Sequence, residues 1–345
     1  MSNPLEEDLD HVLAHTRELW EELRGRRIFI TGGTGFFGCW LLESFTWACD
    51  KLDLGAEAVV LTRNPEAFVV KVPHLAAHAA VHLYQGDVRS FDFPVGTFSH
   101  VIHAATESST SLNADDPLLM LDTIVEGTRR TLEFARHCGA RKFLLTSSGA
   151  VYGRQPPELT HIPEDYPGAP DPMDPRSAYG EGKRLAELLC ALYARRYGLE
   201  TKIARCFAFV GPYLPLNAHF AIGNFIRDAI TGGPIEVRGD GTPRRSYLYG
   251  AELAVWLWTI LLRGTACRPY NVGSEDDSSI GDLAKVVAGV CGSDIEVRVH
   301  GKPVPGTTNE RYVPSIRRAV GELGLSQAIG LRESARKTLA INQAS

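Results

Sequence analysis

A glycine-rich loop between an apolar strand and a helix is the feature that most limits the folds open to this chain. Residues 26–31 form a short apolar stretch, residues 32–38 read GGTGFFG, and a helix is expected over about 39–49. In such a G-x-G-x-x-G turn the glycines permit a tight turn, close approach of a pyrophosphate and close packing of the helix on the strand. The helix N-terminus offers its amide groups to phosphates. The loop therefore predicts a nucleotide-binding unit, against the alternative of a glycine turn with a purely structural use.

Short apolar strands continue to alternate with longer helices after this loop. Further strands are expected at 58–61, 81–84, 101–105, 142–146 and 201–206, and helices at about 117–137 and 177–197. This alternation predicts an α/β fold, a Rossmann-type doubly wound parallel sheet. Beyond residue 207 the pattern loosens, with helices near 217–231, 249–263, 280–290 and 315–323 and strands near 235–238 and 295–299. These indicate a smaller α/β C-terminal lobe.

Three parts of the chain follow from this pattern. Residues 1–24 are expected to be a helical extension, because apolar residues recur at helical spacing over 5–24 as in one amphipathic helix. Residues 25–206 are expected to form the dinucleotide-binding domain, and residues 207–345 the lobe that binds substrate.

Composition excludes several classes of protein. The chain has 345 residues, 44% of them hydrophobic, and a formal charge of −5, so we expect neither a disordered chain nor a nucleic acid as main partner. The apolar run 251–262 is too short to span a bilayer, and residues 1–10 lack the basic-then-apolar order of a signal peptide. Seven scattered cysteines favour free thiols in a reducing compartment. A cytoplasmic protein without a membrane partner is therefore expected.

The end of the second strand bears on which dinucleotide the loop binds. The chain reads Leu61-Thr62-Arg63-Asn64 there, without the acid that bonds the ribose 2′-hydroxyl of NAD and with an arginine suited to the 2′-phosphate of NADP. NAD and NADP both stay open, with a preference for NADP. The alternative is that Arg63 is a solvated loop residue. Asp87, after the third strand, is expected to contact the adenine amino group.

A tyrosine and a lysine four residues apart form the candidate catalytic pair. Tyr179 and Lys183 stand near the start of the helix over 177–197, so their side chains share one face. The ammonium group is expected to lower the pKa of the phenol and make it usable as an acid or base. Such a pair can arise by chance, but Ser148 ends the preceding strand and can bond the same substrate oxygen. Ligands bind at this edge of an open α/β sheet.

Further short motifs follow in a fixed order. They are Gly86-Asp87-Val88, His103-Ala104-Ala105, Gly127-Thr128, Thr146-Ser147-Ser148-x-x-Val151-Tyr152-Gly153, Gly239-Asp240-Gly241 with Arg245, and Asn271-Val272-Gly273. Together with the glycine loop and Tyr179-x-x-x-Lys183, they resemble the extended short-chain dehydrogenase/reductases, within them the nucleotide-sugar epimerase/dehydratase group, over about residues 26–325.

The resemblance implies a bound NAD or NADP and a nucleoside-diphosphate sugar as substrate. Tyr179 would be the acid/base, Lys183 would also hold the nicotinamide ribose, and Ser148 would assist. The expected cofactor contacts are Gly32, Gly35, Phe36, Phe37, Gly38, Thr62, Arg63, Asp87, Val88, Ala104, Ala105 and Lys183. The expected substrate contacts are Ser148, Gly149, Tyr179, His219, Asn224, Arg245 and Arg311.

Departures from the family pattern narrow the chemistry. The 4,6-dehydratases carry an Asp-Glu pair where this chain has Gly149 and Ala150, decarboxylating relatives carry Glu at the second position, and C3/C5-epimerising relatives carry Cys there. Glycine and alanine cannot move protons. What remains is most simply an NDP-hexose 4-epimerase, with an NADPH-dependent 4-keto-6-deoxyhexose 4-reductase as the alternative. A 4,6-dehydratase or a non-catalytic nucleotide sensor is disfavoured.

Two further expectations concern assembly and metals. The resemblance implies a homodimer through the helices over 117–137 and 177–197, with Leu188, Leu192 and Phe134 as candidate contacts, although core packing explains these residues equally well. His74, His78 and His82 recur every four residues, but His82 falls in an expected strand, so no metal site is expected.

Overall fold

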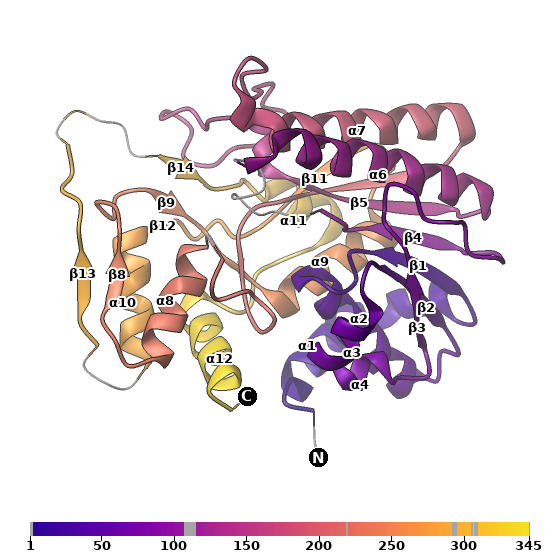
Figure 1. Ribbon diagram of the computed structural model, residues 1–345, viewed down its shortest axis with the longest axis horizontal. Helices are drawn as coiled ribbons and strands as arrows, with labels where there is room; N and C mark the ends of the chain where they lie inside the picture. Colours follow the sequence, from indigo (N-terminus) through magenta and orange to yellow (C-terminus); the bar gives the residue numbers. More distant parts are fainter. Residues whose placement is uncertain are drawn as a thin grey trace.

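The computed structural model describes residues 3–106, 115–218, 220–291, 295–304, 306 and 310–344. Its centre is a seven-stranded parallel sheet in the order β11-β6-β5-β4-β1-β2-β3 (Figure 1). The strands are β1 (Arg27–Thr31), β2 (Glu57–Thr62), β3 (Val81–Gln85), β4 (His100–His103), β5 (Lys142–Ser148), β6 (Glu200–Cys206) and β11 (Pro269–Val272). The strand order reverses between β1 and β4, which is where ligands bind in such sheets. The predicted doubly wound fold is confirmed.

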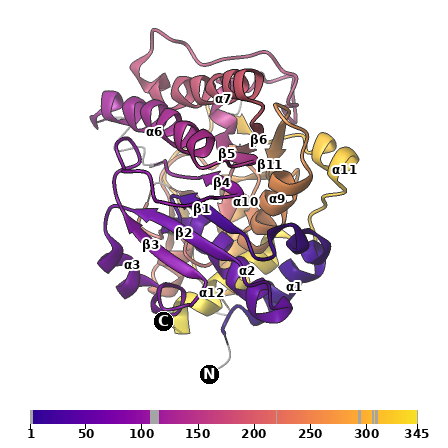
Figure 2. The same ribbon diagram turned by 90° about the vertical axis from the view of Figure 1, so that its right-hand side faces the viewer.

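Helices cover both faces of this sheet (Figure 2). The helices α6 (Pro117–His137) and α7 (Ala178–Tyr197) lie on one face, and α2 (Phe36–Leu52) and α9 (Gly250–Arg263) lie on the other. The sequence explains the ends of the long helices. Asp116 caps α6 by accepting a hydrogen bond from the Leu119 amide at 2.9 Å, and Gly198 ends α7 in the left-handed conformation.

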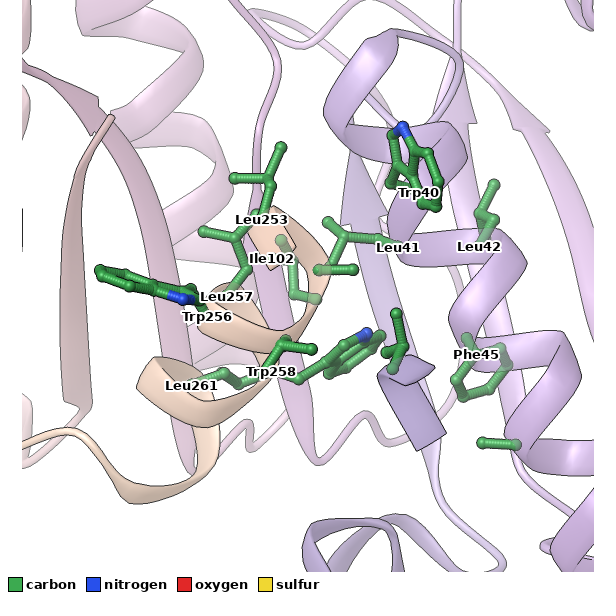
Figure 3. Close-up of a cluster of buried hydrophobic side chains, with 14 of the residues drawn as sticks. Trp40, Leu41, Leu42, Phe45, Ile102, Leu253, Trp256, Leu257, Trp258 and Leu261 are labelled. Carbon is green, nitrogen blue, oxygen red and sulfur yellow. The ribbon is translucent and has the colours of Figure 1, made fainter. Parts of the chain in front are cut away.

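The core under α2 and α9 is rich in large side chains. Figure 3 shows Phe45 of α2 near Trp258 of α9, with ring centres 6.3 Å apart, and both side chains are fully buried, as is Trp40 of α2. The indole of Trp258 donates to Ser44 Oγ at 2.9 Å. Trp256 and Trp258 of α9 are therefore both core residues.

The N-terminal segment is not one helix as expected. It forms α1 (Glu6–Thr16) and then tightens into the 3₁₀ helix η1 (Arg17–Leu23). Both pack into the core beside α2 and α9, and Asp8 accepts a 2.7 Å hydrogen bond from Tyr249. A 3₁₀ helix has about three residues per turn and an α-helix about 3.6. Over the seven residues of η1 this difference is too small for the spacing of the apolar residues to reveal it.

After residue 207 the described chain forms small sheets and further helices besides α9. The sheets pair β7 (Phe209–Val210) with β10 (Leu248–Tyr249), β8 (Ile235–Val237) with β13 (Val297–Val299), and β9 (Arg244–Arg245) with β12 (Ser278–Ser279) and β14 (Arg311–Tyr312). The helices are α8 (Ala221–Ile230), α10 (Ile280–Val290), α11 (Arg317–Leu323) and α12 (Leu331–Ala344). The shorter elements elsewhere are α3 (Pro65–Lys71), α4 (Pro73–Ala76), η2 (Gly149–Tyr152) and η3 (Pro175–Ser177).

The two main parts of the chain share elements. Strand β11 comes after residue 207 in sequence but pairs with β6 in the central sheet, and α9 covers that sheet. The division at residue 206 stays a prediction. No helix among the described residues is long and apolar enough to cross a membrane.

Candidate active site

The glycine loop has the geometry that a pyrophosphate requires. Gly32 has φ +71°, and a Cβ there would lie 2.4 Å from the Ala104 carbonyl carbon, while a Cβ at Gly38 would lie 2.2 Å from Gly33 Cα. At Gly35 the nearest protein atom to a Cβ is the Gly32 oxygen at 3.5 Å, so the protein itself does not require glycine there. A ligand lying against the backbone would account for glycine at this position.

Helix α2 begins directly after this glycine. Gly35 is its N-cap residue, and no side chain caps the helix, so its first-turn amides are directed at the loop. The half-buried rings of Phe36 and Phe37 pack on Phe209, with the Phe37 ring 5.0 Å from it edge-on. Their backbones, not their rings, thus fit a dinucleotide phosphate.

The end of β2 carries no carboxylate. Thr62 is buried and its hydroxyl accepts from the Asn64 amide at 3.3 Å, while the Asn64 side chain accepts from Ala67 N at 3.0 Å as the cap of α3. Arg63 is exposed. Lys71 of α3 donates to the Thr34 carbonyl of the glycine loop at 2.9 Å, which brings a second positive charge to this corner.

Asp87 follows β3 and is half-buried. Its carboxylate accepts hydrogen bonds from the amide and guanidinium of Arg89 at 2.9–3.1 Å. The Arg89 hydrogen bond lowers the pKa of Asp87, so the carboxylate is ionised. Its expected contact with adenine stays a prediction, and the structure adds Arg89 as a neighbour that the motif does not reveal.

The remaining expected cofactor residues lie around the carboxyl end of β4. Ala104 packs against Gly32, and the Ala105 amide donates to Thr31 Oγ1 at 3.3 Å. Val88 covers Gly127 of α6, where a Cβ would lie 3.0 Å from Val88 Cγ1. Ala104 and Ala105 therefore lie beside the glycine loop, and Val88 lies against α6.

The three expected catalytic residues come together at the carboxyl end of β5. Ser148 is the last residue of β5, and its hydroxyl hydrogen-bonds to Tyr179. Lys183 is buried and its ammonium donates to the Thr146 carbonyl and to Thr106 Oγ1, each at 2.8 Å. The Lys183 nitrogen lies 5.9 Å from the centre of the Tyr179 ring. The shared helix face therefore brings a phenol and an ammonium to one side of the serine.

The expected lowering of the Tyr179 pKa by Lys183 is wrong. Burial raises the pKa of Tyr179 to about 12, against a lowering by its hydrogen bond with Ser148. Burial also lowers the pKa of Lys183 to about 8. Desolvation disfavours the charged form of both groups, and it outweighs their attraction because the ammonium bonds Thr146 and Thr106 instead of the phenol.

Tyr312 is a site residue that sequence reasoning missed. It lies in β14 of the C-terminal lobe, yet its hydroxyl is 3.5 Å from Ser148 Oγ and its ring is 4.6 Å from the Phe207 ring. A Cβ at Gly149 would lie 2.7 Å from both the Tyr312 oxygen and Phe207 Cζ. The only sequence signal is that Tyr312 follows Arg311, an expected substrate contact.

The expected substrate-binding arginines already have acidic partners. Arg245 pairs with Glu310, and Arg311 pairs with Asp277 at 3.2 Å and donates to the Thr160 carbonyl at 3.3 Å. The Arg245 guanidinium lies 5.8 Å from the Tyr312 ring, because β9 and β14 place these two residues side by side. Both cations therefore lie on the strand pair that brings Tyr312 to Ser148.

The last two expected substrate residues concern α8. Asn224 lies in its first turn and its side chain accepts from Arg227 at 3.2 Å. His219 lies outside the described residues. Within the described ranges no cluster of three metal-ligating side chains occurs, and His74 and His78 pair instead with Glu43 and Asp50.

Comparisons with known proteins agree with this geometry. The family described as "NAD dependent epimerase/dehydratase family" matches residues 28–273. UDP-glucuronic acid decarboxylase 1 of Xenopus tropicalis is 32% identical over 316 residues, covering 91% of this chain and 71% of that protein. The UDP-glucuronic acid decarboxylase 1 of Arabidopsis thaliana is 32% identical over 308 residues, covering 89% of this chain and 67% of that protein.

Solved structures show the same fold. The UDP-glucose 4-epimerase of Thermotoga maritima superposes with a TM-score of 0.76 at 21% identity, covering 92% of this chain and 99% of its own. The dTDP-glucose 4,6-dehydratase of Streptomyces venezuelae, solved with NAD bound, gives 0.77 at 24% identity, covering 92% and 97%. The chain therefore belongs to the NAD-dependent epimerase/dehydratase family, the nucleotide-sugar-modifying enzymes of the extended short-chain dehydrogenase/reductases.

Proposed function

We propose that this enzyme is an NDP-hexose 4-epimerase that retains its NAD. The observation that carries the proposal is the turn directly after Ser148, where Gly149 and Ala150 offer no group that moves protons. The space for a side chain at Gly149 is taken by Phe207 and Tyr312. Chemistry that removes a proton from carbon needs a second acid/base, whereas 4-epimerisation needs only hydride transfer and one acid/base at the 4-oxygen.

The proposed residue roles follow from positions around Ser148. A bound NAD supplies the acceptor and later the donor of the hydride. Tyr179, as phenolate, takes the proton of the 4-hydroxyl while the hydride leaves C4, and it returns that proton when the hydride comes back to the other face. Ser148 holds the 4-oxygen, and Lys183 orients the nicotinamide ribose and stabilises the phenolate.

The nucleotide end of the substrate is proposed to bind at the small sheet of the lobe. Arg245 and Arg311 lie on the paired strands β9 and β14, and a diphosphate can replace Glu310 and Asp277 as their partner. Asn224, in the first turn of α8, is proposed to contact the sugar nucleotide.

The relatives named as decarboxylases do not change this proposal. In decarboxylating members of the family a glutamate stands where this chain has Ala150. Without that carboxylate the chain lacks the group that such chemistry uses, so we do not transfer the decarboxylase activity to it. The sequence identity of 32% with the Xenopus decarboxylase supports membership of the same family. Ala150, which cannot move a proton, argues against the same reaction.

A 4-keto reductase is the second candidate, and the β2 corner favours it. The exposed Arg63 and the anchored Lys71 offer positive charge, and no acid is present for the ribose 2′-hydroxyl, which suits NADP. In that reaction Tyr179 donates a proton to the 4-oxygen and NADPH is consumed in each turnover.

Cofactor release separates the two candidates. The purified protein is denatured and the released nucleotide is identified by mass spectrometry. Near-stoichiometric NAD or NADH is expected for the epimerase, because its cofactor is regenerated in place. A protein that releases none and binds NADPH supports the reductase and counts against the epimerase.

The Tyr179→Phe variant tests the catalytic assignment. Removing the phenol hydroxyl removes the only proposed acid/base, so kcat is expected to fall by a factor of about 10²–10⁴ with cofactor affinity unchanged. Turnover is measured with UDP- and dTDP-linked glucose and galactose. Turnover equal to that of the unaltered protein would rule out the role of Tyr179.

A further inference from the structure

A buried chain of hydrogen bonds links the end of β5 to the segment that carries Arg311 and Tyr312. The Tyr152 hydroxyl donates to Asn271 Oδ1 at 2.7 Å, and both side chains are buried. We propose that Tyr152 and Asn271 are positioning residues, whose hydrogen bond sets Arg311 and Tyr312 in place for a nucleoside diphosphate. The proposal deepens the proposed function, on which it rests for the role of the nucleotide.

The Asn271 side chain acts as a branch point. Its amide nitrogen donates to the Ile162 carbonyl at 2.9 Å and to the Ser315 carbonyl at 3.0 Å. Its oxygen accepts from Tyr152. Both amide hydrogens and the oxygen are thus used, so the orientation of this side chain is fully determined. Only an amide satisfies all three partners.

The segment after Tyr312 is bonded to the loop that follows the catalytic strand. Ile162 N donates to the Val313 carbonyl and Ser315 N donates to the Ile162 carbonyl, each at 2.9 Å. Val313 N donates to Gln155 Oε1 at 3.0 Å. These bonds and those of Asn271 fix the backbone one residue beyond Tyr312.

The other end of the chain of bonds reaches the catalytic helix. Arg205 donates to the Tyr152 hydroxyl at 2.9 Å and forms a two-pronged ion pair with Glu187, with its closest contact at 2.7 Å. Glu187 stands one helical turn after Lys183 and accepts from Ser147 Oγ at 2.6 Å. One continuous set of contacts therefore spans α7, β5, β11 and the segment with Tyr312.

The consequence is geometric. The Tyr312 hydroxyl lies 3.5 Å from Ser148 Oγ, and Arg311 precedes it, so a shift of the segment moves both groups relative to the reacting sugar. A displacement of about 1 Å in an active site can change a rate by about a hundredfold. The hydrogen bond of Tyr152 resists such a shift.

The test compares two tyrosine-to-phenylalanine variants. Tyr152→Phe keeps the ring and removes the hydroxyl, and Arg205 retains the Glu164 carbonyl at 3.1 Å as a partner. Tyr270→Phe is the matched control. Tyr270 is adjacent to Asn271 on β11 and equally buried, but its hydroxyl donates to Glu322 at 2.9 Å, away from the site.

Three measurements are made on both variants of the full chain: affinity for UDP or dTDP, affinity for NAD, and hydrogen exchange of the peptide covering 310–316. Tyr152→Phe is expected to bind the nucleoside diphosphate about tenfold more weakly, to bind NAD unchanged and to exchange faster over 310–316. Tyr270→Phe is expected to change none of these. An effect shared by both variants, or unchanged exchange in Tyr152→Phe, overturns the proposal.

Turnover distinguishes a positioning role of Tyr152 from a purely structural one, because a purely structural role would leave kcat unchanged. With a substrate that the unaltered protein converts, kcat of Tyr152→Phe is expected to fall about tenfold at unchanged NAD affinity. Faster exchange with unchanged kcat and unchanged nucleotide affinity overturns the proposal. Should Tyr152→Phe not fold, Gln155→Leu removes the acceptor of Val313 N and is expected to give the same pattern. If the unaltered protein does not epimerise the UDP- or dTDP-linked sugars, the 4-epimerase assignment fails. The nucleotide affinity and the hydrogen exchange of Tyr152→Phe still test the role of Tyr152 in that case.

Discussion

At the scale of single residues, two buried groups with opposite shifts decide how the site responds to pH. Burial holds the pKa of Tyr179 at about 12 and that of Lys183 at about 8. The proposed epimerase needs Tyr179 as phenolate and Lys183 as ammonium. This form has one proton fewer than the site with both groups protonated. The reductase needs the phenol with the ammonium, the fully protonated form.

The pH profile of kcat/KM therefore has opposite signs for the two functions. For the epimerase the rate should rise about tenfold per pH unit up to about pH 8 and then level off, because the active fraction grows until Lys183 begins to lose its proton. For the reductase the rate should be level below about pH 8 and fall above it. Rates measured from pH 6 to 9.5 distinguish them, and a level profile followed by a fall contradicts the epimerase.

At the scale of elements, the ends of helices with strong capping signals were predictable, whereas the contacts of the C-terminal lobe were not. The sequence places helices at 117–137 and 280–290, the bounds of α6 and α10, because Asp116-Pro117 and Ser279 are strong starting signals. Strands of two residues, such as β14, carry no detectable period. The contact of Tyr312 with Ser148 depends on the pairing of β14 with β9, a long-range event that local patterns do not encode.

The candidate dimer surface shows that the spacing of apolar residues does not predict which of them are exposed. Leu188 and Leu192 of α7 are 52% and 53% exposed, but Phe134 of α6 is fully buried against Phe29, with ring centres 4.5 Å apart. Phe134 is therefore a core residue, as the core-packing alternative expects, and it is not available for a dimer contact. Apolar spacing does not tell which side of a helix is covered when both sides carry apolar residues.

We propose that the exposed leucines of α7 form a homodimer contact. The double variant Leu188→Arg/Leu192→Arg places charges in that contact and should convert a dimer, of twice the chain mass of 37.8 kDa, into a monomer. Light scattering measures the mass. Val320→Arg, at a comparably exposed apolar residue of α11, should leave it unchanged. A monomeric unaltered protein would contradict the proposal.

At the scale of the whole molecule, elements that are far apart in the sequence complete one core. Helix α1 and strand β11 both join the part built around the glycine loop. Two histidines inside this body are neutral when folded, since burial lowers the pKa of His100 to about 4 and of His103 to about 3. His103 bridges the hydroxyls of Thr31 and Thr128 at 2.8 and 3.1 Å.

The free energy of unfolding should therefore fall as pH drops. A histidine with a lowered folded pKa contributes stability above its unfolded value of about 6.5, and that stability is lost progressively below it. For His103 the loss by pH 4 is about 3 kcal/mol. Urea unfolding from pH 7 to 4 measures it. His103→Gln should flatten the slope, whereas His82→Gln, at a half-exposed residue, should not, and equal slopes in all three proteins would contradict this account.

The central claim, hydride transfer at C4 without a second acid/base, is tested most directly by turnover in D₂O. The enzyme is incubated with UDP- and dTDP-linked glucose and galactose, and the products are read by NMR. The account predicts interconversion of the 4-epimers with no deuterium at any sugar carbon, because the hydrogen on C4 travels as hydride and no C–H proton exchanges with solvent. UDP-linked glucuronic acid is incubated in parallel. Deuterium at C3, C5 or C6, loss of water from a hexose, or loss of carbon dioxide from the glucuronic acid would show that another group moves protons at carbon and would contradict the account.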